Sequence, residues 1–223
     1  MGSDVNLSTI IYEKIKKDII EMRREPDTYL LERQVAAEHS TSRTPVREAI
    51  KRLMQEGWLV GEDRCRTKIS DLNLAACHDV FNVRMMIEHY ALTETFSRGE
   101  GRALAGKLDV EMKKMASLED DPIAFVRADV GFHSVIVEHI GNALLTKIWR
   151  SISDEIIRIS IFAMDEQRQP EKIVLEHAKI VDALWNHAPD LLTTLDNHMN
   201  HILEGMELCF ERRDGEKEPA GSR

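Results

Sequence analysis

Apolar residues recur every three or four positions along almost the whole chain, and this helical periodicity restricts the fold more than any other feature. Near the N-terminus, Ile11, Ile15 and Ile19 form one such stripe. Proline or glycine interrupts the periodicity at intervals, which predicts separate helices. The stretch from Trp58 to Ser70 differs, because two short runs flank a polar turn, as in a β-hairpin. The chain is therefore predicted to be mostly α-helical.

The predicted elements divide the 223 residues into two domains and a tail. Three predicted helices precede the hairpin, over residues 7–22, 30–39 and 44–56. This order is the layout of a winged helix-turn-helix. Six more helices, expected to form an antiparallel all-α bundle, cover residues 74–97, 101–117, 121–140, 142–163, 170–187 and 190–212. We expect a winged helix-turn-helix domain over 1–72, a helical domain over 73–213 and a disordered tail over 214–223.

Charge is distributed unevenly along the chain, whose net charge is −9. Residues 1–70 contain 13 Lys and Arg against 12 Asp and Glu, whereas residues 71–223 contain 17 against 27. Binding to nucleic acid requires cations that neutralise phosphates. A nearly neutral N-terminal part can bind DNA where its arginines share one face, and the acidic remainder is available for another role.

Targeting and cysteine signals are both weak. No apolar run approaches the ~20 residues that cross a bilayer, and the segment Met1–Asp4 does not begin a signal peptide. Cys65, Cys77 and Cys209 lie far apart, so they form neither a disulfide framework nor a Cys-x-x-Cys motif. We expect a cytoplasmic protein with reduced cysteines and no membrane partner.

The third predicted helix carries the main candidates for reading DNA. Arg43 and Arg47 lie one turn apart and share a face, opposite an apolar stripe that includes Val46 and Ile50. A helix in the major groove presents its N-terminal residues to bases and phosphates, and the guanidinium fork can pair with either. The spacing predicts that both arginines contact DNA.

Other polar residues surround this pair. Ser42 and Thr44 add hydroxyl groups at the same helix end, and Arg33 on the second helix can reach the DNA backbone. The alternative is an ordinary solvated face, in which the arginines pair with Glu38 and Glu48. Taken singly, each arginine fits that alternative better.

Taken together, these residues resemble the GntR family of transcription regulators. The resemblance rests on the segment Leu31–Ala36, on the segment Ser42–Ile50, and on Leu53 with the Glu-Gly-Trp-Leu run that follows. It implies a DNA-binding fold with a wing near the minor groove. It also implies operator contacts by Arg33, Ser42, Arg43, Thr44 and Arg47.

The sequence departs from the family pattern at two turns. The glycine usual at the wing tip is replaced around Arg64-Cys65-Arg66, where Arg64 and Arg66 are candidates for an electrostatic contact with DNA. The segment Pro26–Thr28 stands where a Pro-Gly turn usually precedes the second helix.

A candidate metal site lies in the helical domain. Asp129 and His133 are four residues apart, so both project from one face of a helix and can bind a single cation. Such a pair alone is more often structural. An antiparallel bundle could also bring His177 and His198 to the same centre. One Asp and three His would suit Zn²⁺, Ni²⁺ or Mn²⁺ without selecting among them.

The surrounding sequence resembles the C-terminal FCD domain of the FadR-like GntR subgroup. The matching runs are Asp129–His133, Ile136 and Gly141–Leu145. Many FCD domains hold a metal with one Asp and three His, which the resemblance maps onto Asp129, His133, His177 and a fourth ligand. The family spacing and the helical phase favour His198 for this position, with His201 as the alternative.

The resemblance also implies an effector. In such domains a small organic acid reaches the metal through its carboxylate, and Arg84 is the candidate contact for that anion. The equally acceptable alternative is that Arg84 forms a salt bridge with Glu88, one turn along the same helix.

We therefore expect a non-enzymatic transcription regulator, a repressor in particular, that binds a pseudo-palindromic DNA operator as a homodimer. A small carboxylate would control it from a metal-containing helical domain. The alternative is a metal-dependent hydrolase that uses the same Asp and His residues to activate water. That chemistry needs a general base, and without a His-Glu-x-x-His motif Glu176 is the obvious candidate.

Overall fold

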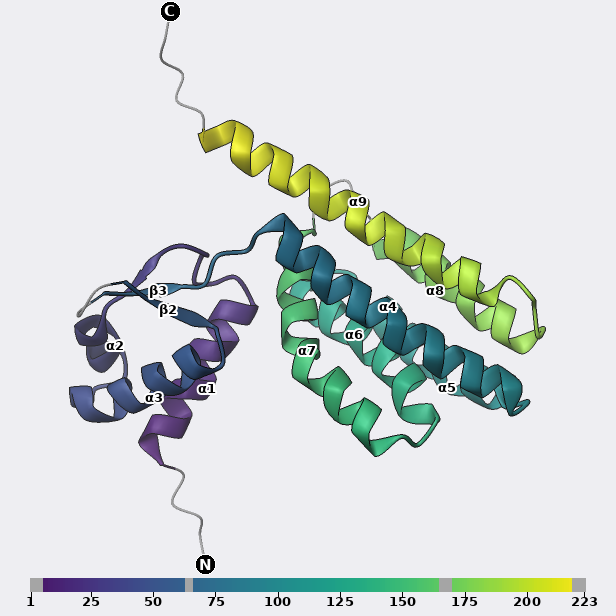
Figure 1. Ribbon diagram of the computed structural model, residues 1–223, viewed down its shortest axis with the longest axis horizontal. Coiled ribbons are helices and arrows are strands. Elements are labelled where there is room, and N and C mark those ends of the chain that lie inside the picture. The colour runs from purple at the N-terminus through teal and green to yellow at the C-terminus, as the bar shows by residue number, and fades with distance from the viewer. Residues whose placement is uncertain (1–5, 63–65, 165–169, 218–223) are drawn as a thin grey trace, which may run out of the picture. The chain divides into compact units, whose positions relative to one another are not determined.

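The computed structural model describes residues 6–62, 66–164 and 170–217 (Figure 1). The chain forms two compact units, which comprise residues 1–72 and 73–223. Helices dominate both units, as the apolar periodicity predicted. Among the described residues, no helix combines the length and the hydrophobicity needed to cross a bilayer.

Three helices form the core of the first unit: α1 (Leu7–Ile20), α2 (Glu32–Glu38) and α3 (Arg43–Gln55). The predicted stripe of α1 is fully buried at Ile11, Ile15 and Ile19. Helix α1 packs against α3, which buries Val46 and Leu53. Burial of these side chains therefore holds α3 in place and leaves its opposite face to solvent.

A small antiparallel sheet completes the first unit. Strands β2 (Leu59–Glu62) and β3 (Arg66–Ile69) form the predicted hairpin, with Leu59 paired to Ile69. A further strand, β1 (Tyr29–Leu30), pairs with the other edge of β3 and gives the order β1-β3-β2. The prediction that the second helix starts at Leu30 was wrong, because this residue belongs to the sheet.

Left-handed backbone conformations shape the connection between α1 and the sheet. Met22 has a φ of 56°, and α1 ends at Ile20, two residues before the predicted end. Asp27 has a φ of 61° in the turn where the family usually has glycine. Its N–H donates to the Ile69 carbonyl at 3.1 Å. Aspartate tolerates this conformation better than most residues, so it can replace glycine here.

The second unit is a bundle of long helices (Figure 1). Helix α6 packs against α4, α5 and α7, and α9 packs against α4, α7 and α8. The helices are α4 (Leu74–Ser97), α5 (Gly101–Ala116), α6 (Pro122–His139), α7 (Ala143–Phe162), α8 (Pro170–Trp185) and α9 (Leu191–Lys217). Each differs from its predicted range by a few residues at most, except at the end of α9.

Polar side chains determine where several of these helices begin. Asn73, Asp121 and Asn142 accept hydrogen bonds from backbone N–H groups in the first turns of α4, α6 and α7. Helix α9 continues to Lys217, so the predicted tail, residues 214–223, starts too early. Residues 218–223 lie outside the described residues.

The packing of α3 predicts a large effect of one truncation. Leu53→Ala removes a fully buried side chain between α3 and its neighbours, and it should lower the free energy of unfolding by about 2–5 kcal/mol. Chemical denaturation followed by circular dichroism measures the change. Leu31→Ala, at an exposed position in the same unit, is the control and should cost far less. Equal losses in the two variants would contradict this packing.

Candidate DNA interface and candidate metal centre

The N-terminal end of α3 presents polar side chains to solvent. Ser42 is the residue that caps this helix, and Arg43 and Thr44 form its first turn. All three are exposed, as is Arg47 one turn later. Val46 lies on the opposite, buried face. The structure therefore separates the predicted DNA-reading residues from the apolar stripe, as the spacing required.

The arginines gather around one hollow of the first unit. Arg33 from α2, Arg43 and Arg47 from α3, and Arg66 at the start of β3 line a depression of about 520 Å³. Cationic side chains from three separate elements thus face the same space, which suits a polyanionic backbone. Arg64, the other predicted wing residue, lies outside the described residues.

The predicted solvated-face alternative applies only in part. Glu38 pairs with Arg24, with an oxygen-to-nitrogen distance of 2.7 Å, rather than with the arginines of α3. Arg47 instead pairs with Glu32, at 2.9 Å. Both partners of this pair are solvent-accessible, so the pair contributes little stability and can be replaced by a phosphate contact.

Four side chains of the second unit meet in its interior. Asp129 and His133 come from α6, His177 from α8 and His198 from α9. One ligand atom from each lies within 4.8 Å of the others, and all four residues are buried. The antiparallel bundle thus brings together the residues that the sequence singled out as metal ligands.

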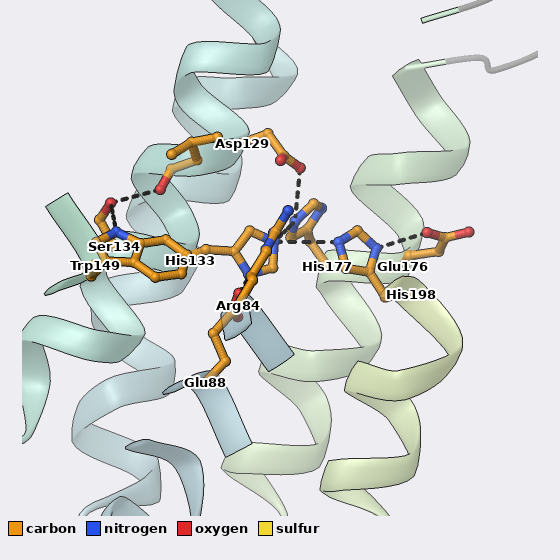
Figure 2. A network of polar contacts seen from close by, with 10 residues as sticks. Arg84, Glu88, Asp129, His133, Ser134, Trp149, Glu176, His177 and His198 are labelled. Carbon is orange, nitrogen blue, oxygen red and sulfur yellow. Dashed lines mark hydrogen bonds and ion pairs between the residues drawn. The ribbon is translucent and has the colours of Figure 1, made fainter. Parts of the chain in front are cut away.

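The three imidazole rings present the same nitrogen to this centre (Figure 2). The Nε2 atom of His133 lies 3.1 Å from that of His177 and 3.3 Å from that of His198. A carboxylate oxygen of Asp129 lies 3.3 Å from Nε2 of His177. One oxygen and three nitrogens therefore converge in an arrangement that can hold a divalent cation.

A separate acceptor holds the other nitrogen of each ring. Nδ1 of His133 donates to Glu88 at 2.6 Å, and Nδ1 of His198 donates to Glu176 at 2.8 Å. Nδ1 of His177 donates to the Ile173 carbonyl at 2.8 Å. These bonds leave the Nε2 lone pairs directed at the centre, as ring orientation in metal sites requires.

Burial determines the charge of this cluster. It lowers the pKa of His177 and holds the pKa values of His133 and His198 well below the ordinary value. Burial alone would raise the pKa of Asp129, but the facing histidines and Arg84 lower it to about 2. At neutral pH the cluster therefore offers three neutral imidazoles and one carboxylate, the protonation state that metal binding requires.

The alternative fourth ligand, His201, lies outside the cluster. Its side chain is 55% exposed, and its Nδ1 atom contacts Glu176 at 2.6 Å. His198, in contrast, is 1% exposed. Glu176 is thus held between two histidines, which makes it a poor general base for the hydrolase alternative.

Arg84 forms the predicted salt bridge and also keeps donors without a partner. It is fully buried, and its Nε donates to Glu88 at 2.8 Å, which is the predicted salt bridge. Among the described residues, however, neither of its Nη atoms has a hydrogen-bond partner. Because a buried guanidinium rarely leaves donors unused, these groups are available for an anion.

Sequence reasoning did not identify Glu88 and Glu176 as partners of the histidines. Glu88 bonds a residue 45 positions away, and Glu176 bonds one 22 positions away. No local spacing reveals such pairs. The remaining signal was Arg84, one turn before Glu88, which predicts a charged pair but not its link to His133.

Comparison with known proteins agrees with this architecture. Residues 7–69 match the profile of bacterial regulatory proteins of the gntR family, and residues 79–201 match the FCD domain. A gluconate operon transcriptional repressor from Bacillus licheniformis is 27% identical over 186 residues, which cover 80% of this chain and 76% of that protein. The transcriptional repressor RspR of Escherichia coli K12 is 21% identical over 198 residues, which cover 88% of this chain and 87% of that protein.

A solved structure shares the fold. A GntR transcriptional regulator from Rhodococcus sp. RHA1 aligns with a TM-score of 0.70 and 19% identity, covering 89% of this chain and 96% of that one. The winged helix-turn-helix and the helical bundle define a DNA-binding transcription regulator. The chain belongs to the GntR family, and its second unit is an FCD domain. The hydrolase alternative receives no support from these relatives.

The buried imidazoles predict how stability depends on pH. Because the pKa values of His133, His177 and His198 lie below 6.5 in the folded protein, the unfolded chain binds more protons below that pH. For metal-free protein, the free energy of unfolding should therefore decrease as pH falls from about 7.5 to about 5.5. Glu88, whose pKa burial raises, opposes this trend at the acidic end.

Urea denaturation in the presence of a chelator measures the dependence. The control is His201→Gln, which changes an exposed histidine on the same helix as His198. This variant should show the same dependence of the free energy of unfolding on pH as the wild type. A free energy of unfolding that stays constant over this range would show that the cluster is not buried in its neutral form.

Proposed function

We propose that this regulator represses transcription from a pseudo-palindromic operator, and that a small carboxylate bound at a metal in the FCD domain controls its affinity for DNA. The contacts of Arg84 support the proposed binding of a carboxylate. Its two Nη groups are buried beside the four-ligand cluster and have no hydrogen-bond partner among the described residues. The arginine-lined hollow of the first unit supports the proposed binding of operator DNA.

The donor chemistry supports a resident divalent cation. Three Nε2 lone pairs and a carboxylate point at one another in a buried space, where a cation would compensate their mutual repulsion. Asp129, His133, His177 and His198 would hold Zn²⁺, Ni²⁺ or Mn²⁺. When bound, the ion would supply a positive centre to which a carboxylate oxygen can bind.

The effector is proposed to be a small carboxylate. Arg84 offers two N–H-bearing groups side by side, the geometry that pairs bidentately with a carboxylate. Two relatives are named for the gluconate operon, and gluconate is itself a carboxylate. Control of transcription requires that the effector bind the DNA-competent and DNA-incompetent states with different affinities.

A homodimer is proposed because two-fold symmetric operators bind two-fold symmetric proteins, with one recognition helix in each half-site. The outer face of α4 supports self-association. Met86 is 64% exposed and Tyr90, one turn later, is 47% exposed. Methionine and aromatic side chains are enriched at protein–protein interfaces relative to the rest of the surface.

The proposed DNA interface predicts that substituting arginines of the hollow weakens DNA binding, whereas substituting another arginine of α3 does not. Arg43→Ala and Arg47→Ala each remove a guanidinium from the hollow and should weaken binding to DNA upstream of the protein's own gene by about 10- to 100-fold. Arg52→Ala is the matched control. Arg52 lies on the same helix but stacks on Tyr12 and pairs with Glu56. Electrophoretic mobility shift at fixed salt measures all three, and wild-type affinity in both test variants would refute the assignment.

The proposed metal site predicts that substituting His198 and substituting His201 have different effects on the amount of bound metal, although both histidines bond Glu176. His198→Ala should strongly reduce the bound metal, whereas His201→Ala should retain close to the wild-type amount, because only His198 points Nε2 at the cluster. Elemental analysis of protein purified without chelator and without a histidine tag gives the stoichiometry. Loss in His201→Ala with retention in His198→Ala would reverse the assignment, and no metal in the wild type would refute it.

A further inference from the structure

Two carboxylates contact the candidate metal ligands in the same way but differ in their other contacts. Glu88 accepts from Nδ1 of His133 at 2.6 Å, and Glu176 accepts from Nδ1 of His198 at 2.8 Å. Each carboxylate has a second oxygen. The partner of that second oxygen distinguishes their roles.

The second oxygen of Glu88 faces inward. It accepts from Nε of Arg84 at 2.8 Å (Figure 2). Both residues are fully buried. Arg84 is the residue whose two Nη groups have no hydrogen-bond partner among those described. One carboxylate therefore connects the candidate anion-binding group directly to a candidate metal ligand.

The second oxygen of Glu176 faces outward. It contacts Nδ1 of the exposed His201 at 2.6 Å. Glu176 thus orients the ligand His198, and its two oxygens bond histidines rather than Arg84. Glu88 and Glu176 can therefore be compared directly. Each bonds Nδ1 of a candidate metal ligand, but the second oxygen bonds Arg84 in Glu88 and His201 in Glu176.

We propose that Glu88 is a positioning residue that couples metal binding to carboxylate binding. This inference rests on the proposed function of the site. By bonding Arg84 and His133 at once, Glu88 fixes the guanidinium relative to the ligand cluster, so that one small carboxylate can meet the metal and Arg84 together. Each ligand then increases the affinity for the other, and by the same factor in both directions.

Substitution by glutamine distinguishes a carboxylate that links Arg84 to His133 from one that only orients a metal ligand. A carboxylate offers two acceptor oxygens, whereas glutamine offers one acceptor and one donor group. His133 and Arg84 bond different oxygens of Glu88. In Glu88→Gln, one of these two positions becomes an NH2 group, which cannot accept from the residue that faces it, so the link breaks. In Glu176→Gln, the oxygen can still accept from His198 while the amide group faces His201, which is exposed and can adjust.

The experiment measures zinc affinity by competition with a chromogenic chelator, with and without saturating acetate as the carboxylate probe. In the wild type, acetate should tighten zinc binding by roughly 5- to 150-fold, the usual range of coupling between two sites. Glu176→Gln should weaken zinc binding itself by about tenfold or less yet keep the wild-type coupling factor. Glu88→Gln should weaken zinc binding by about 10- to 100-fold and lower the coupling factor well below the wild-type value, to what direct contact between acetate and zinc alone provides.

A second variant tests the link from its other end. Arg84→Gln leaves the bond between Glu88 and His133 in place and should also lower the coupling factor well below the wild-type value. Circular dichroism verifies that each variant folds, and Arg84→Gln decides the outcome where Glu88→Gln does not fold. Acetate affinity measured with and without zinc must change by the same factor as zinc affinity.

The possible failures differ from one another. A wild type that binds no zinc overturns the proposed metal site and this inference together. A wild type that binds zinc with no response to acetate overturns the carboxylate effector and, with it, the coupling. Wild-type coupling that persists in Glu88→Gln overturns only the role assigned to Glu88. Wild-type coupling that persists in Arg84→Gln overturns, in addition, Arg84 as the carboxylate contact.

Discussion

The arrangement of the FCD domain depends on burying three histidines whose rings all face one point. Burial of a polar ring is unfavourable unless each nitrogen has a partner. Here every Nδ1 has its own acceptor, on α4 for His133, within α8 for His177 and on α8 for His198. A helix shifted by one residue would break one of these bonds and turn a ring away. The histidines therefore fix the relative register of α4, α6, α8 and α9.

Most of the fold could be predicted from the sequence, because local signals determine where its helices begin and end. Asp121 followed by Pro122 marks the start of α6, since an aspartate cap and an N-terminal proline both favour a helix start. Apart from the ends of α1 and α9, the error occurred where a distant partner decides the structure. Tyr29–Leu30 becomes a strand only because β3 lies beside it, and a two-residue strand has no periodicity to detect.

The sequence predicts those residues of the candidate metal site whose spacing places them on one face of a helix. Asp129 and His133 share a helix face, which their spacing alone reveals. Bringing His177 and His198 to the same point required the bundle topology, and choosing His198 over His201 required helical phase. The acceptors behind the rings could not be predicted, because Glu88 is an ordinary helix residue until α6 packs against α4. Sequence spacing thus finds ligands more readily than the groups that orient them.

The two domains use charged side chains in opposite ways, and this difference supports the proposal that one chain both binds DNA and senses a small molecule. The candidate DNA interface keeps its arginines exposed, where the pair between Arg47 and Glu32 costs little to exchange for phosphate. The FCD domain instead buries Arg84 with Glu88, where an unused donor is costly and an arriving anion gains correspondingly more. The acidic surplus beyond residue 70 also disfavours contact between the FCD domain and phosphates, which supports the arginine-lined hollow of the first unit as the proposed DNA contact.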